Sequence, residues 1–109
     1  MAELAGDRPA ALGIATSADA AGSPVISVSG DLDISNADAL EAAVSSVTAT
    51  RPAHLTFDLS ALRFIDSAGI AVLLHASSRV KDVRLRTPSP AVRRVVELTG
   101  LGEVFPIEA

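Results

Sequence analysis

Residues 55–74 read LTFDLSALRFIDSAGIAVLL, and this stretch decides the fold. From Leu55 to Leu59, apolar and polar residues alternate, which is the pattern of a half-buried β-strand. From Ala68 to Val80 there is no Pro and no turn cluster, so we expect a helix that runs to about residue 81. The segment Asp66-Ser67-Ala68-Gly69 therefore marks the change from strand, through a loop, to helix.

Ser67 falls at the expected start of this helix, where a hydroxyl has two possible roles. Serine is among the best N-cap residues, because its side chain accepts a hydrogen bond from the unpaired N–H groups there. The positive end of the helix dipole would also tolerate a phosphate attached to the hydroxyl. The residues of this stretch leave both roles open: a plain cap, or a place where a phosphate is added and removed.

The composition indicates one small domain without a cofactor or metal of its own. The chain has 109 residues, a net charge of -4, no Cys and two His that are not at ligand spacing. The length is typical of a single domain, and the acidic balance argues against direct nucleic-acid binding. The first residues lack the features of a signal peptide, and the apolar runs are too short to insert into a membrane. We therefore expect a soluble, cytoplasmic protein.

The rest of the chain predicts alternating strands and helices. We expect a flexible lead-in over residues 1–10 and one domain over 11–109, with Ser35 and Asp38 forming an acidic variant of the capping box at the first helix. Apolar spacing and turn signals predict strands over about 12–16, 25–29, 54–59, 83–86 and 104–105, and helices over about 35–51, 67–81 and 89–100. This order predicts an α/β fold, with a central mixed β-sheet of about four to five strands flanked by three to four helices.

Several short blocks follow one another in a fixed order, and together they resemble the STAS family, the fold of bacterial anti-sigma factor antagonists. The resemblance runs from about Leu12 to the C-terminus and implies a central sheet flanked by helices. The blocks are Gly30-Asp31-Leu32-Asp33, Phe57-Asp58-Leu59-Ser60, Phe64-Ile65-Asp66-Ser67-Ala68-Gly69, Pro88-Ser89-Pro90-Ala91-Val92-Arg93-Arg94 and Thr99-Gly100-Leu101.

The resemblance implies roles for particular residues. Ser67 aligns with the serine that a partner kinase phosphorylates in anti-sigma factor antagonists. Asp33 matches an acidic residue that family members use in partner recognition or kinase action, although a turn carboxylate that accepts backbone N–H bonds explains it equally well. Ala68 departs from the family, because many members have Ser or Thr there, and this leaves Ser67 as the phosphoacceptor of the motif. The implied partner-binding set is Asp33, Asp66, Ser67, Ala68, Gly69 and Ile70.

The resemblance also implies partners. The chain would bind an anti-sigma factor with serine kinase activity and so release a sigma factor, and a Ser/Thr phosphatase would remove the phosphate from Ser67. ATP and Mg²⁺ would belong to the kinase. The chain itself would be a monomer or a weak dimer.

Two other interpretations remain open. The first is a STAS scaffold that is never phosphorylated, or an accessory subunit of a signalling or membrane-transport complex. The second, which ranks far below, is a hydrolase that uses Ser67 as its nucleophile. The segment Asp-Ser-Ala-Gly is not the Gly-x-Ser-x-Gly elbow of hydrolases, and no Walker-type phosphate loop is present. We therefore expect that the chain is not an enzyme.

Overall fold

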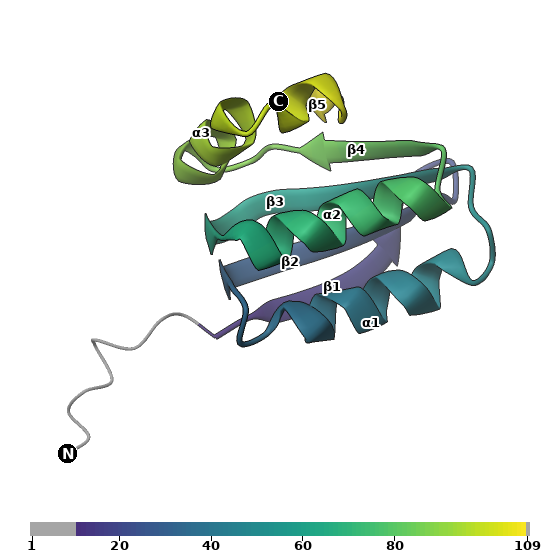
Figure 1. The fold of residues 1–109 in the computed structure, drawn as a ribbon. Helices are drawn as coiled ribbons and strands as arrows, with labels where there is room; N and C mark the ends of the chain where they lie inside the picture. Colours follow the sequence, from purple (N-terminus) through teal and green to yellow (C-terminus); the bar gives the residue numbers. More distant parts are fainter. Residues whose placement is uncertain (1–10, 109) are drawn as a thin grey trace, which may run out of the picture.

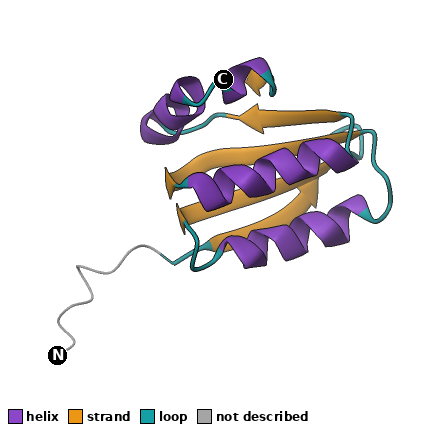
Figure 2. Cartoon of the chain, viewed as in Figure 1, coloured by secondary structure: helices purple, strands orange, loops and turns teal. Residues whose placement is uncertain are grey.

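The computed structural model describes residues 11–108, so the lead-in expected over residues 1–10 lies outside the described residues. Over this range the chain forms a five-stranded sheet in the order β1-β2-β3-β4-β5 (Figure 2). The strands are β1 (Gly13–Ala18), β2 (Pro24–Leu32), β3 (His54–Ile65), β4 (Asp82–Arg86) and β5 (Ile107–Glu108). The helices are α1 (Ala37–Thr48), α2 (Ser67–Arg79) and α3 (Pro90–Leu98), with the short 3₁₀ helix η2 (Leu101–Glu103). This is the predicted α/β fold with a mixed sheet.

Helices α1 and α2 lie side by side on one face of the sheet (Figure 1). β1 pairs antiparallel with β2, whereas β2, β3, β4 and β5 run parallel to one another. Parallel strands end at the same edge of a sheet, and Leu32 at the end of β2 pairs with Ile65 at the end of β3. The segment that leads into α1 and the segment that leads into α2 therefore lie next to each other.

The core between the sheet and the helices is built from aliphatic side chains and two phenylalanines. In α1 the apolar residues Ala37, Leu40 and Val44 recur at helical spacing and are buried. Phe57 and Phe105 are the largest fully buried side chains. Because these residues come from a helix, a central strand and the C-terminal segment, packing joins the whole described chain into one unit.

Strand β3 is longer than predicted, and the predicted loop before α2 is absent. The strand runs on to Ile65, so that Asp66 alone separates it from α2. Ser60 and Ala61 are both exposed, and the alternation of apolar and polar residues breaks there. The sequence pattern therefore stops halfway along a strand that continues by pairing with β2.

Gly30 lies inside β2, which runs beyond the predicted end of this strand at about residue 29. It has a φ of 86°, and the register of β2 against β3 shifts between Gly30 and Asp31. A positive φ is favourable for glycine and strained for other residues, which explains glycine at this irregularity.

The end of the chain also differs from the prediction. The strand expected at residues 104–105 is wrong, because this segment follows η2 and Phe105 is buried in the core. The pairing with β4 is made by Ile107 and Glu108 instead. Gly100, with a φ of 76°, ends α3 as predicted.

Gly69 packs close against the sheet, which predicts a strong effect of alanine. A Cβ at Gly69 would lie 2.7 Å from the Leu32 side chain and 2.8 Å from Ile65 Cγ1, and both side chains are buried. We expect Gly69→Ala to lower the free energy of unfolding by about 1–3 kcal/mol, even though alanine is the better helix former. Urea denaturation measures this change.

Gly102→Ala is the matched control for this prediction. A Cβ at Gly102 would meet Ile107 Cδ1 at 3.5 Å, which is an ordinary contact distance. We expect a change in the free energy of unfolding within about 0.5 kcal/mol. Equal losses in the two variants would contradict the packing argument.

Candidate functional site

Asp66, not Ser67, caps helix α2. Its backbone is extended, and its Oδ1 accepts hydrogen bonds from the N–H groups of Ala68 at 2.9 Å and Gly69 at 3.2 Å. Ser67 is the first residue of the helix, so of the two roles that the sequence left open for it, the capping role belongs to Asp66 instead. A carboxylate at the N-cap also interacts favourably with the helix dipole, which explains why Asp66 takes this position.

The hydroxyl of Ser67 is therefore uncommitted. The side chain is exposed, and its Oγ makes no hydrogen bond with any residue in the described part of the chain. His54 pairs with Asp82 and His75 pairs with Glu41, and within the described residues neither histidine makes the hydrogen bond to Ser67 that the base of a serine nucleophile would make. What the geometry offers is a free hydroxyl at a helix N-terminus that a second protein can reach.

Asp33 opens a compact turn between β2 and α1. Its Oδ1 accepts hydrogen bonds from the N–H group of Ser35 at 2.9 Å and from the Ser35 hydroxyl at 2.5 Å. Asn36 closes the turn, because its Oδ1 accepts from the Asp33 N–H at 2.9 Å and its Nδ2 donates to the Asp31 carbonyl at 2.8 Å. Asp33 thus makes the backbone hydrogen bond of a turn carboxylate.

The predicted capping box of α1 does not form. The helix begins at Ala37, two residues later than expected, with Asn36 at the N-cap position. The hydroxyl of Ser35 is bound to Asp33, and the Asn36 side chain turns back toward β2. Asp38 still lies in the first turn, where its charge interacts favourably with the helix dipole.

Asp66 joins these two regions. Its Oδ2 accepts a hydrogen bond from the N–H group of Ile34 at 3.1 Å, and its own N–H donates to the Leu32 carbonyl at 3.2 Å. The structure therefore brings together Asp33, Asp66 and Ser67 at one edge of the sheet, where β2 and β3 end.

The other predicted residues are less accessible. Ala68 and Ile70 are half-buried and pack against the core, and Gly69 is buried between α2 and the sheet. Gly69 therefore acts through close packing of the helix against the sheet.

Sequence reasoning missed Ile34. Its side chain is 82% exposed, directly beside Asp33. Ile34 stands three residues before Ala37, so its spacing continues the apolar stripe of α1, although it precedes both the predicted and the observed start of that helix. The signal in the sequence that could have identified Ile34 was an isoleucine placed between the end of a predicted strand and the start of a predicted helix.

A groove of about 470 Å³ runs between α1 and α2 and begins at Ile34. At its other end Glu41 of α1 is 2.8 Å from Arg79 Nη1 and 3.3 Å from His75 Nδ1, both of α2. Partial burial raises the pKa of Glu41, but the hydrogen bonds from Arg79 and His75 outweigh this effect and hold its pKa below the ordinary value. The ion pairs tie the two helices together along the groove.

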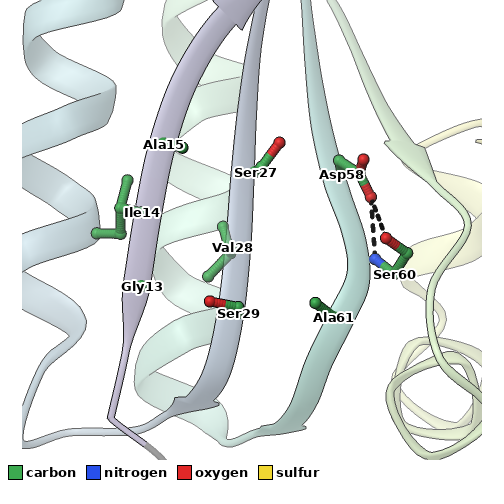
Figure 3. A pocket seen from close by; sticks show the side chains of 9 residues that line it. All are labelled: Gly13, Ile14, Ala15, Ser27, Val28, Ser29, Asp58, Ser60 and Ala61. Atoms are coloured by element: carbon green, nitrogen blue, oxygen red, sulfur yellow. Dashed lines mark hydrogen bonds between the residues drawn. The ribbon is translucent and has the colours of Figure 1, made fainter.

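A second hollow of about 300 Å³ lies over β1, β2 and β3 (Figure 3). Small side chains such as Ala15, Ser27 and Ala61 line it. Its carboxylate, Asp58, is bound by the N–H and hydroxyl groups of Ser60 and by Arg86 at 3.2 Å. The charge in this hollow is already paired, and neither Ser67 nor Asp33 lines it, so it is separate from the candidate site.

Two further properties concern the described range as a whole. Within residues 11–108, no three His, Cys, Asp or Glu side chains come together in a way that could hold a metal ion. No helix of this range has both the length and the apolar character needed to cross a membrane.

Comparison with known proteins identifies the family to which this chain belongs. A family model described as "Mlab, STAS domain" matches residues 15–107. The anti-sigma-F factor antagonist RsfB of Mycobacterium tuberculosis is 36% identical over 93 residues, which are 83% of this chain and 76% of that protein. RsfA of the same organism, also an anti-sigma-F factor antagonist, is 32% identical over 89 residues, 76% of this chain and 70% of that protein. The chain belongs to the STAS-domain family.

Solved structures agree with this assignment. An anti-sigma factor antagonist from Mycobacterium paratuberculosis superimposes with a TM-score of 0.83 at 35% identity, over 90% of this chain and 86% of that one. The anti-sigma factor antagonist SpoIIAA in its unphosphorylated form gives a TM-score of 0.75 at 22% identity, over 89% of each chain, and at this identity the likeness concerns the fold. The resemblance found in the sequence is therefore confirmed.

The capping geometry predicts that alanine lowers the free energy of unfolding at Asp66 but has little effect at Ser67. We expect Asp66→Ala to lower the free energy of unfolding by about 1–2 kcal/mol, because the N-cap acceptor is lost. We expect Ser67→Ala to change it by no more than about 0.5 kcal/mol, because the hydroxyl makes no hydrogen bond. Chemical denaturation of both variants measures this difference, and the reverse order would show that Ser67 is the cap after all.

The lowered pKa of Glu41 predicts a pH dependence. A carboxyl whose pKa is depressed by folding stabilises the folded state above its ordinary pKa, 4.5, and this contribution is lost as the pH falls through the lower folded value. We expect Glu41→Gln to lower the Tm at about pH 5 and above, and this difference from the wild type to shrink as the pH falls below about 4.5.

Thermal unfolding across this pH range measures the effect. Asp38→Asn is the control, because it removes a carboxylate from the same groove that has no ion pair within the described chain. A Tm difference for Glu41→Gln that stays constant down to the acid limit would contradict the prediction.

Proposed function

We propose that this chain is an anti-sigma factor antagonist that phosphorylation of Ser67 switches off. The unphosphorylated chain binds an anti-sigma factor with serine kinase activity, and this binding releases a sigma factor. The kinase then transfers the γ-phosphoryl group of ATP to Ser67 Oγ, whose proton is lost, and ADP remains with the kinase. A Ser/Thr phosphatase hydrolyses the phosphate ester and restores the binding form.

The observation that carries this proposal is the exposed, unbonded hydroxyl of Ser67 beside a cap that Asp66 already provides. A kinase needs a hydroxyl that it can reach and that no other group holds. The relatives named anti-sigma factor antagonists support the same function.

Electrostatics explain how one phosphate would act as a switch. Phosphorylation adds about -1.5 to -2 charges at neutral pH. The helix N-terminus tolerates this charge, so the fold is retained, while Asp66 and Asp33 make the surrounding surface more negative. Like charges brought together in an interface cost several kcal/mol, which is enough to separate the complex.

The proposed docking surface combines Ser67, the turn at Asp33 and the exposed side of α2. The half-exposed parts of Ala68 and Ile70 belong to this proposed surface, whereas buried Gly69 supports it by letting α2 pack closely against the sheet. ATP and Mg²⁺ belong to the kinase, and this chain contributes the acceptor hydroxyl. We further propose that the chain works in the cytoplasm as a monomer or weak dimer, without direct contact with nucleic acid.

Mass spectrometry of the chain from its native cells tests the covalent step. We expect a modification of about 80 Da on the peptide that contains Ser67, and its removal by phosphatase treatment. Partner capture tests the consequence: Ser67→Ala should bind the anti-sigma factor constitutively, and Ser67→Asp should bind at least about tenfold more weakly. Ser17→Asp, at an exposed position of β1, is the matched control and should bind like the wild type.

The same experiments separate the alternative function. A STAS scaffold or an accessory subunit would keep Ser67 unmodified in growing and in stressed cells, and Ser67→Asp would leave its partner binding unchanged. That pair of results would contradict the switch.

A further inference from the structure

One carboxylate at the edge of the sheet holds three backbone N–H groups that come from two distant segments. Oδ1 of Asp66 accepts from Ala68 and Gly69, at the start of α2. Oδ2 accepts from Ile34, 32 positions earlier in the chain. The two oxygens therefore have different tasks: one caps a helix, and the other holds the turn between β2 and α1.

The turn that Oδ2 holds is well ordered within itself. Asp33 and Asn36 close it through side-chain hydrogen bonds to backbone groups. Within residues 11–108, the bond from Ile34 to Asp66 is the side-chain hydrogen bond that connects this turn to the start of α2. The Asp66 carboxylate therefore adds to the strand pairing and to the bond from the Asp66 N–H to the Leu32 carbonyl, and fixes where Ile34 lies relative to Ser67.

The residue held in this way presents an unusual side chain. Ile34 is 82% exposed, and together with Ala68, Ala71 and Val72 it lines the groove between α1 and α2. An exposed aliphatic side chain on a rigid turn, beside a groove, has the character of an anchor for an apolar pocket in a partner. Holding such a side chain in place before binding reduces the entropy lost on association.

A phosphate on Ser67 would compete directly with Asp66. Phosphate oxygens at a helix start are drawn to the same N–H groups that Asp66 Oδ1 occupies. A phosphate also repels a carboxylate on the adjacent residue. When the Asp66 side chain turns away, the Ile34 N–H loses its acceptor as well.

We propose that Asp66 is a positioning residue that couples Ser67 to Ile34. Its carboxylate holds the Ile34 turn in the arrangement that binds the anti-sigma factor, and the phosphate on Ser67 displaces the carboxylate and loosens the turn. The partner presents an apolar pocket for Ile34 next to the site where it contacts Ser67. This inference rests on the proposed function and adds a second route by which phosphorylation weakens binding.

Asp66→Asn separates the two tasks of the carboxylate. Asparagine caps helices as well as aspartate does, but it has one acceptor oxygen, and its amide nitrogen only donates. The variant therefore keeps the cap and leaves the Ile34 N–H without its acceptor. Asp38→Asn is the matched control, because it removes an equal charge from the first turn of α1, beside the groove that Ile34 lines, and the Ile34 N–H is bound to Asp66 and not to Asp38.

Amide hydrogen exchange followed by NMR tests the coupling without a partner protein. We expect the exchange rate of the Ile34 amide to rise about tenfold in Asp66→Asn and in the chain made with phosphoserine at position 67. In Asp38→Asn the rate should stay within about twofold of the wild type. An Ile34 rate that does not change in the phosphoserine chain would overturn the proposal.

Binding to the kinase that phosphorylates Ser67 gives the second test. We expect Ile34→Ala to weaken binding about tenfold and Asp66→Asn about fivefold, because one loses the anchor and the other its fixed position. The double variant should bind no more weakly than Ile34→Ala, whereas independent residues would multiply their effects to about fiftyfold. Multiplied effects would overturn the coupling.

The outcomes distinguish this proposal from the function on which it rests. If Ser67 is phosphorylated and the phosphate weakens binding while the Ile34 amide is unaffected, the coupling is wrong and the switch stands. If Ser67 is never modified in cells, the proposed function is wrong, even where the phosphoserine chain shows the change at Ile34.

Discussion

The parallel pairing of β2 with β3 is the constraint on which the site depends. It sets Leu32 opposite Ile65, so that two strands that are far apart in the sequence end at one edge of the sheet. The Asp66 N–H group donates to the Leu32 carbonyl and continues this pairing one residue beyond the strand. Helix α1 makes the connection between the two strands, as parallel pairing requires. Without this pairing, the turn at Asp33 and the start of α2 would be unrelated surfaces.

The order of residues at the start of α2 divides three physical tasks among three neighbours. Asp66 satisfies the unpaired N–H groups of the helix, and Ser67 is thereby left with a free hydroxyl. Gly69 lets the helix lie close to Leu32 and Ile65. If Ser67 were the cap, its oxygen would be held by backbone N–H groups. Phosphorylation of the hydroxyl would then have to disrupt the start of the helix.

The order of the elements and most of the core could be predicted from the sequence. Apolar periodicity located α1 and its buried face, and turn chemistry located the end of α3 at Gly100. The second half of β3 could not be predicted, because exposed Ser60 and Ala61 interrupt the alternation, and the strand is maintained there by its pairing with β2.

For the candidate site, too, only part could be predicted from the sequence. Ser67 and Asp33 were found from the motifs, but local preferences could not decide which residue caps α2, since Asp and Ser are about equally good caps. The structure places Asp66 there with contacts to Ile34 and Leu32, which only tertiary structure supplies. Ile34 was missed, because its spacing from Ala37 imitates the apolar stripe of α1 although the residue lies ahead of that helix.

The antiparallel hairpin at the start of the described chain has a practical consequence for handling the protein. Because Gly13 pairs with Ser29, β1 begins near the edge at which β2 ends, while the turn from Asp19 to Ser23 lies at the opposite end of the sheet (Figure 1). A bulky tag fused ahead of β1 would thus emerge on the side of the molecule that carries Ser67. A fluorophore or an immobilising linker attached at exposed Ala21 would leave that side turned toward the solution.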